Sequence, residues 1–161
     1  KHAYQANPWS WLVLGRPTSF YYESPSDCGA EKCAQEILAI GTPLLWWISI
    51  FAVAITFGFL VTKLERAAAI ILLGFAGTYL PWFFIQSRTT FYFYSISSLP
   101  FLILALIYCF NQLLNSAIYK KYIISFVILV AINFIYFLPI YLGISIPYSQ
   151  WLSRMWFESW I

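Results

Sequence analysis

The stretch Pro43–Val61, PLLWWISIFAVAITFGFLV, contains no Asp, Glu, Lys or Arg. Three further runs share this property: Ala67–Ile85, Phe91–Phe110 and Tyr122–Leu142. An α-helix that rises 1.5 Å per residue needs about twenty apolar residues to cross the hydrocarbon core of a bilayer. Because a segment in lipid must satisfy its own backbone polar groups, each run is expected to form a continuous helix. The four runs therefore predict four membrane-spanning helices.

The composition of the whole chain agrees with a membrane protein. Of the 161 residues, 61% are hydrophobic and 9% are charged, and the mean hydropathy is +0.74. A soluble globule of this size needs more polar surface. Aromatic residues make up 22% of the chain, and Trp and Tyr concentrate near the ends of the runs, where amphipathic rings sit at headgroup level. We therefore expect an all-α membrane fold with four transmembrane helices.

Basic residues in the short links predict the orientation, since such residues are retained on the cytoplasmic side. Lys63 and Arg66 lie between the first two runs, and Lys120 and Lys121 lie between the last two, whereas the middle link carries only Arg88. Both ends of the chain are therefore expected outside the cytoplasm, in a multi-pass protein of the plasma membrane. The net charge of +3 is divided between the two faces and indicates no nucleic-acid partner.

The chain divides into three parts under this interpretation. Residues 1–41 form an extracytoplasmic aromatic-rich segment, residues 42–143 the four-helix region, and residues 144–161 an extracytoplasmic tail. Gly and Pro break the first segment into short extended pieces, at Asn7–Pro17 and Ser19–Tyr22. Trp151, Trp156 and Trp160 follow Pro147 at helical spacing, which predicts an interfacial helix.

The three cysteines fit this orientation. Cys28 and Cys33 fall in the segment placed outside, where an oxidising compartment permits a disulfide, whereas Cys109 lies near the inner end of the third run. We expect a disulfide between Cys28 and Cys33. Two free thiols are the alternative, because spacing alone does not fix the distance between the Cα atoms. A metal site is less favoured, since no further Cys or His lies near this pair.

Chemistry-bearing residues are few. Arg88 stands on the predicted outer face among aromatic residues, and its guanidinium could bind a phosphate through paired hydrogen bonds, or simply anchor the helix end at the interface. No carboxylate lies inside a run. The acidic residues expected outside are each interpreted as solvated loop charges rather than as a general base: Glu23, Asp27, Glu31, Glu36 and Glu158.

Four stretches in order resemble a known family. They are Asn7–Tyr22 (NPWSWLVLGRPTSFYY), Ile40–Trp47 (IGTPLLWW), Tyr79–Tyr94 (YLPWFFIQSRTTFYFY) and Ile146–Trp156 (IPYSQWLSRMW). Together they are similar to the C-terminal four-helix region of bacterial protein O-mannosyltransferases, which are dolichyl- or polyprenyl-phosphate-mannose–protein mannosyltransferases. The resemblance implies a C-type glycosyltransferase that transfers mannose, with inversion, from a polyprenyl phosphate donor to Ser or Thr of exported proteins.

The resemblance also implies where the reaction would take place. Arg88 aligns with a family motif at the outer end of a helix, which favours it as a ligand of the lipid phosphate, with Gln86 and Tyr92 as weaker candidates. The catalytic carboxylate of the family lies near the N-terminus of the full protein, so no catalytic residue is expected in this chain. The expected partners are membrane lipid, the lipid-linked donor, exported acceptor proteins and an N-terminal part of the same protein. Neither a covalent cofactor nor a metal is expected.

A second interpretation remains. Because no carboxylate lies within a run, the chain could instead be a non-catalytic membrane component, such as half of a transporter or an assembly partner. A sequence that begins near Lys1 would favour this interpretation, whereas the absence of an initiator Met favours the C-terminal part of a longer enzyme.

Overall fold

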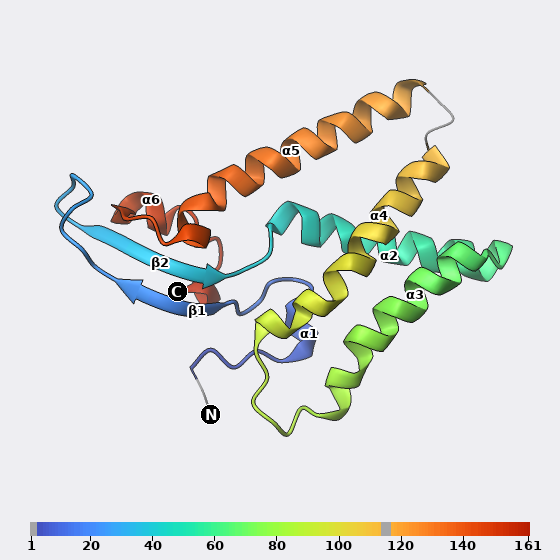
Figure 1. The fold of residues 1–161 in the computed structure, drawn as a ribbon, viewed down its shortest axis with the longest axis horizontal. Helices are drawn as coiled ribbons and strands as arrows, with labels where there is room; N and C mark the ends of the chain where they lie inside the picture. Colours follow the sequence, from blue (N-terminus) through green and yellow to red (C-terminus); the bar gives the residue numbers. More distant parts are fainter. Residues whose placement is uncertain (1–2, 114–116) are drawn as a thin grey trace.

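Four long helices dominate the computed structural model, which describes residues 3–113 and 117–161 (Figure 1). Helix α2 covers Pro43–Lys63, and α3 covers Arg66–Tyr79 and continues as the 3-10 helix η1, Leu80–Phe84. The 3-10 helix η2, Tyr92–Ser98, leads into α4, Leu99–Leu113, and α5 covers Ala117–Leu142. By length and composition these helices give four candidate membrane spans. The predicted spans are confirmed.

Prolines mark where the helices change geometry. Helix α3 ends at Tyr79, and Pro81 lies in the tighter η1 that follows. Pro100 is the second residue of α4 and lies where the 3-10 helix η2 changes into the α-helix. Pro139 is accommodated inside α5, which ends at Leu142 before Gly143, whose φ of +66° suits glycine.

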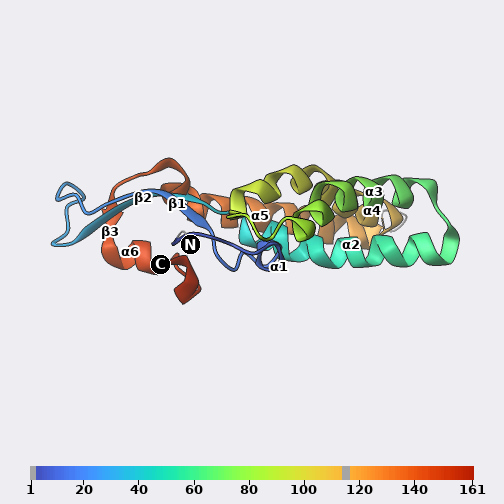
Figure 2. The same ribbon diagram turned by 90° about the horizontal axis from the view of Figure 1, so that it is seen from below.

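A small antiparallel sheet lies at one end of the helices, which we call the sheet end (Figures 1 and 2). Its strand order is β1-β2-β3, with β1 at Thr18–Glu23, β2 at Cys33–Ala39 and β3 at Ile146–Pro147. The prediction of an extended piece at Ser19–Tyr22 is confirmed. The helical membrane fold is also confirmed, and the sheet is an addition to it that a description as all-α omits.

Two local predictions were wrong. Within Asn7–Pro17 the chain is not extended throughout, because Pro8–Trp11 forms the short helix α1. Pro8 at the first helical position has a backbone angle suited to a helix, and the Asn7 side chain caps it. The predicted interfacial helix is also broken, into α6 at Tyr148–Leu152 and the 3-10 helix η3 at Glu158–Trp160.

The tail after α5 folds back onto the N-terminal segment. Trp151 and Trp160 are buried, and the indole of Trp160 donates to the Leu14 carbonyl at 2.6 Å. Such a partner removes the cost of burying an indole N–H and holds the tail against the N-terminal segment. The two segments that flank the membrane region in sequence are therefore packed together at the sheet end.

Candidate functional site

The Arg88 loop, residues 85–91, joins η1 to η2 at the sheet end. The Arg88 backbone N–H donates to the Ile85 carbonyl at 3.1 Å, which turns the chain. The Arg88 side chain is exposed, and among the described residues its guanidinium has no hydrogen bond or ion pair with another side chain. Its donors are therefore free for a ligand.

The other cations at the sheet end contrast with Arg88. The Arg16 guanidinium donates to the Ser159 carbonyl at 2.6 Å, and Arg154 donates through Nε to the Tyr136 carbonyl at 2.7 Å. The Lys32 ammonium lies 3.8 Å from the centroid of the Tyr148 ring. Each of these three holds one segment of the chain against another. Among the described cations at this end, Arg88 is the one whose side chain does not join two segments of the chain.

The N-terminal segment holds the Arg88 loop from both sides. At its far end, the Ala6 N–H donates to the Thr90 carbonyl at 2.9 Å, and Thr90 Oγ1 donates to the Ala6 carbonyl at 2.8 Å. At its near end, Asn7 Nδ2 donates to Gln86 Oε1 at 3.0 Å. The rings of Trp9 and Phe83 also pack edge to face, with their centroids 4.6 Å apart.

Gln86 and Tyr92 have partners that limit their use as phosphate ligands. Gln86 Nε2 donates to the Phe83 carbonyl at 2.9 Å while Oε1 accepts from Asn7. Tyr92 is only 4% exposed, and its hydroxyl accepts from the Gly41 N–H at 3.0 Å. The structure does not show the two side chains bonded to Arg88, so they are better suited to supporting the loop and its helix than to binding an anion directly.

Tyr92 borders an apolar cavity of about 330 Å³ between the start of α2, the η2 segment and α5. The lining residues that carry polar side-chain groups are Thr42, Trp46, Tyr92, Ser95 and Tyr141. Gly41 has no room for a side chain, because a Cβ there would lie 1.8 Å from Nε1 of Trp46. This close contact fixes the link between β2 and α2 beside the cavity.

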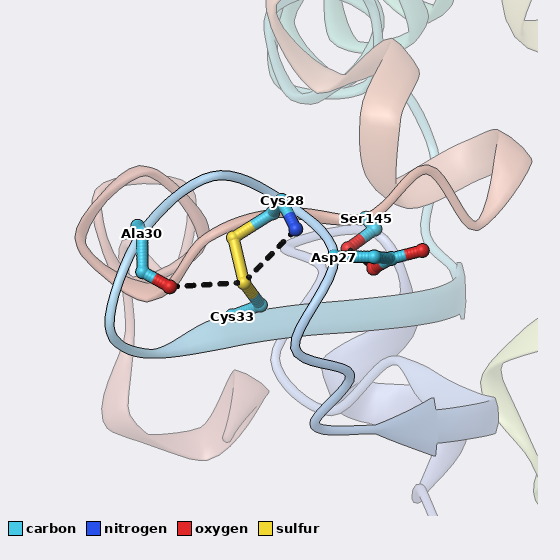
Figure 3. Close-up of a disulfide and its surroundings, with 5 residues drawn as sticks. All are labelled: Asp27, Cys28, Ala30, Cys33 and Ser145. Atoms are coloured by element: carbon cyan, nitrogen blue, oxygen red, sulfur yellow. Dashed lines mark hydrogen bonds between the residues drawn. A yellow bond between two sulfur atoms is a disulfide. The ribbon is translucent and has the colours of Figure 1, made fainter.

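Figure 3 shows the tip of the hairpin between β1 and β2. Cys28 and Cys33 form a disulfide there, with their Cα atoms 5.9 Å apart. Ser145 Oγ donates to Asp27 Oδ1 at 3.0 Å, which ties the hairpin to the segment after α5. Within the described residues, no three His, Cys, Asp or Glu side chains gather into a group that could hold a metal ion.

Glu36 is not a solvated loop charge, and that interpretation was wrong. It lies on β2, is 4% exposed, and accepts a hydrogen bond from the Trp151 indole at 2.6 Å. Burial raises the pKa of the Glu36 carboxyl, and hydrogen bonds from Ser19 and Trp151 oppose that rise. On β2 the side chain of Glu36 points to the buried face of the strand. The sequence does not predict this burial, because it depends on the packing of α6 against β2.

Comparison with known proteins identifies the family to which this chain is similar. Residues 1–160 match the C-terminal four-transmembrane region of protein O-mannosyltransferase. The chain is 27% identical over 168 residues to a polyprenol-phosphate-mannose–protein mannosyltransferase of Corynebacterium glutamicum, and 25% identical over 169 residues to one of Mycobacterium tuberculosis. Each alignment covers 99% of this chain and 32% of the relative, so the chain spans about a third of the length of the relatives.

The fold matches a solved structure as well. The chain superimposes on the Saccharomyces cerevisiae protein O-mannosyltransferase Pmt1-Pmt2 complex bound to the sugar donor, with a TM-score of 0.77 and 22% identity. The superposition covers 100% of this chain and 24% of that one, and at this identity it supports the fold alone. With the family match over nearly all of its length, the chain belongs to the C-terminal four-transmembrane region of the protein O-mannosyltransferase family.

Proposed function

We propose that this chain is the C-terminal membrane part of a glycosyltransferase that moves mannose from a polyprenyl phosphate donor to Ser or Thr of exported proteins. The observation that carries the proposal is the family match over residues 1–160. The names of the bacterial relatives, which are polyprenol-phosphate-mannose–protein mannosyltransferases, support the choice of donor.

Arg88 is the residue that we assign to the donor phosphate. A guanidinium presents several N–H donors in a plane that matches the oxygens of a phosphate. Its exposure at the sheet end and its lack of a partner among the described side chains support this role. Gln86 and Tyr92 are assigned to the same site as supports of the loop and of η2, since their main polar contacts are already made.

The chemistry requires one group more than this chain offers. The acceptor hydroxyl attacks the anomeric carbon, the bond from that carbon to the phosphate oxygen breaks, and the hydroxyl proton passes to a carboxylate. No Asp or Glu lies within a predicted span, and Glu36 is bonded to an indole. We therefore infer that the base comes from the N-terminal part of the protein, and that this chain holds the leaving phosphate.

The reaction would take place outside the cytoplasm at the plasma membrane. Four basic residues lie at or near the helix ends on the side opposite the sheet: Lys63, Arg66, Lys120 and Lys121. By the preference of such residues for the cytoplasmic side, the sheet end and both ends of this chain face outward. Exported acceptor proteins would approach from that side.

The proposal is tested by a transfer assay on the full-length protein in lipid. Polyprenyl phosphate carrying labelled mannose and a Ser/Thr peptide are expected to give a labelled peptide, with inverted configuration at the anomeric carbon. A peptide in which Ala replaces every Ser and Thr should stay unlabelled. Transfer from another lipid-linked sugar in place of mannose would contradict the choice of donor.

The absence of a carboxylate within the spans also favours a second candidate, a non-catalytic membrane component. The same assay separates the two. A full-length protein that binds the lipid-linked sugar but transfers nothing to a peptide or to water, under conditions in which a known relative is active, would favour the non-catalytic component.

A further inference from the structure

We propose that Asn7 is a positioning residue for the donor phosphate, because its side chain holds the Arg88 loop through Gln86. The inference rests on the proposed function of Arg88. It adds a residue that lies far from Arg88 in sequence and touches neither the guanidinium nor, on this account, the donor.

Asn7 uses both ends of its side-chain amide. Its Oδ1 accepts from the Trp9 N–H at 3.1 Å and caps α1, while its Nδ2 donates to Gln86 Oε1 at 3.0 Å. Gln86 in turn donates to the Phe83 carbonyl at 2.9 Å. A continuous series of hydrogen bonds thus runs from the start of α1 to the end of η1.

This series secures the near end of the Arg88 loop. The far end is secured separately by the Ala6 and Thr90 bonds, and Thr90 is 3% exposed. Between them Ser87, Arg88 and Thr89 are exposed, and the turn is closed by the bond from the Arg88 N–H to Ile85. Asn7 therefore provides the side-chain contact from outside the loop that fixes where the turn begins.

A fixed loop matters because binding is weakened by the cost of ordering the groups that bind. If the near end is released, the guanidinium samples positions away from the phosphate, and the donor binds less tightly. The mannose transfer step itself does not involve Asn7. The effect is therefore expected on the KM for the donor, with kcat little changed.

The test uses Asn7→Ser in the full-length protein. Serine can still cap α1 through its hydroxyl, but it is too short to reach Gln86. We expect the KM for polyprenyl phosphate mannose to rise about two- to tenfold, the range of one hydrogen bond, with kcat within about twofold. Gln86→Leu should raise KM similarly, and the double variant should be no worse than the single ones.

Ser10→Ala is the matched control. Ser10 Oγ donates to the Asn7 carbonyl at 2.8 Å in the same turn, yet it has no bond to the Arg88 loop. This variant should leave KM unchanged. A spin label on Thr89→Cys supplies a readout that does not depend on activity, and Asn7→Ser should increase its mobility whereas Ser10→Ala should not.

Unchanged label mobility in Asn7→Ser, or a KM equal to that of Ser10→Ala, would overturn the proposal. Failure of the proposed function is distinguishable from this result. It would appear as an unchanged donor KM in Arg88→Ala, with the spin label still reporting whether Asn7 holds the loop.

Discussion

Glu36 and Trp151 show how single residues join the two segments that flank the membrane region. The carboxylate on β2 accepts from the indole on α6, and both side chains are buried. Tyr22, directly opposite Glu36 on β1, packs its ring against Trp151 at 5.5 Å. Burial makes the charge of this carboxyl costly at neutral pH even though hydrogen bonds offset part of the cost, so the stability should depend on pH.

The pH dependence has a definite sign. Because the pKa of folded Glu36 lies above its unfolded value, the folded state binds more protons between the two, and the free energy of unfolding falls as pH rises through that interval. Glu36→Gln keeps an oxygen acceptor for Trp151 and should remove this decline. Between about pH 4 and about pH 8, the unfolding temperature of Glu36→Gln should rise relative to that of the wild type as the pH increases.

Glu36→Ala provides the contrast. It leaves the buried indole N–H without its acceptor and should lower the free energy of unfolding by about 1–3 kcal/mol at low pH. This deficit should shrink as the pH rises, because the wild type loses stability there and the Ala variant has no carboxyl to titrate. If Glu36→Gln and the wild type show parallel curves, the carboxyl does not titrate in this interval and the buried environment is wrong.

The disulfide is a second feature at the residue scale. Cys28 and Cys33 close a small loop at the hairpin tip, and Cys109 is free and buried in the helices. Replacing both paired cysteines with Ser should cost about 2 kcal/mol by the loop-entropy estimate. Peptide mapping of the unfolded, unreduced protein should leave Cys28 and Cys33 unalkylated and Cys109 alkylated. Alkylation of all three without reductant would exclude the bond.

At the scale of helices, close contacts between α3 and α4 rely on a small residue. A Cβ at Gly74 would lie 2.0 Å from the ring of Phe101, whereas a Cβ at Gly77 would meet nothing within 4 Å. Nearby, Thr78 Oγ1 of α3 donates to Ser98 Oγ at 3.3 Å, at the last residue of η2 before α4 begins. Small residues and single hydrogen bonds of this kind hold helices together in lipid.

Gly74→Ala should therefore destabilise this helix pair. The Phe101 ring must move, which costs about 1–3 kcal/mol in a packed interior, and the unfolding temperature of the full-length protein should fall. Gly77→Ala, about one helical turn away, is the control and should leave the unfolding temperature nearly unchanged. Equal effects of the two substitutions would mean that α3 and α4 do not pack as described.

The sequence predicts some elements better than others, for physical reasons. The spans depend on local composition, and the prediction of Pro43–Val61 differs from α2 by only the residues near Lys63. Ala34 pairs with Ile146 although the four long helices separate the two residues in sequence. No local pattern encodes such a contact.

The same distinction applies to the candidate site. Arg88 is prominent in the sequence because it is a lone charge beside an apolar run. The hydrogen bond between Asn7 and Gln86 could not be predicted from the sequence. Asn before Pro indicates a helix cap, but it does not indicate a second hydrogen-bond partner. The burial of Glu36 is likewise a property of the packed tail.

At the scale of the whole molecule, orientation connects the fold with the proposed reaction. Thr89 lies in the Arg88 loop at the sheet end, and Lys120 lies near the start of α5 at the opposite end, and both are exposed. In intact cells a membrane-impermeant thiol reagent should label the full-length Thr89→Cys variant. Lys120→Cys should be labelled only after the membrane is permeabilised. The reverse pattern would place the sheet end in the cytoplasm and contradict the proposed site of transfer.

The central claim is that this membrane region holds the donor phosphate through Arg88. The most direct measurement is the dissociation constant of polyprenyl phosphate mannose for the full-length Arg88→Ala variant, beside Arg66→Ala at the opposite end of the helices as control. Loss of a charge-assisted hydrogen bond of about 1.5–3 kcal/mol predicts roughly 10- to 150-fold weaker binding for Arg88→Ala alone. Equal donor affinity in Arg88→Ala, Arg66→Ala and the wild type would contradict the account.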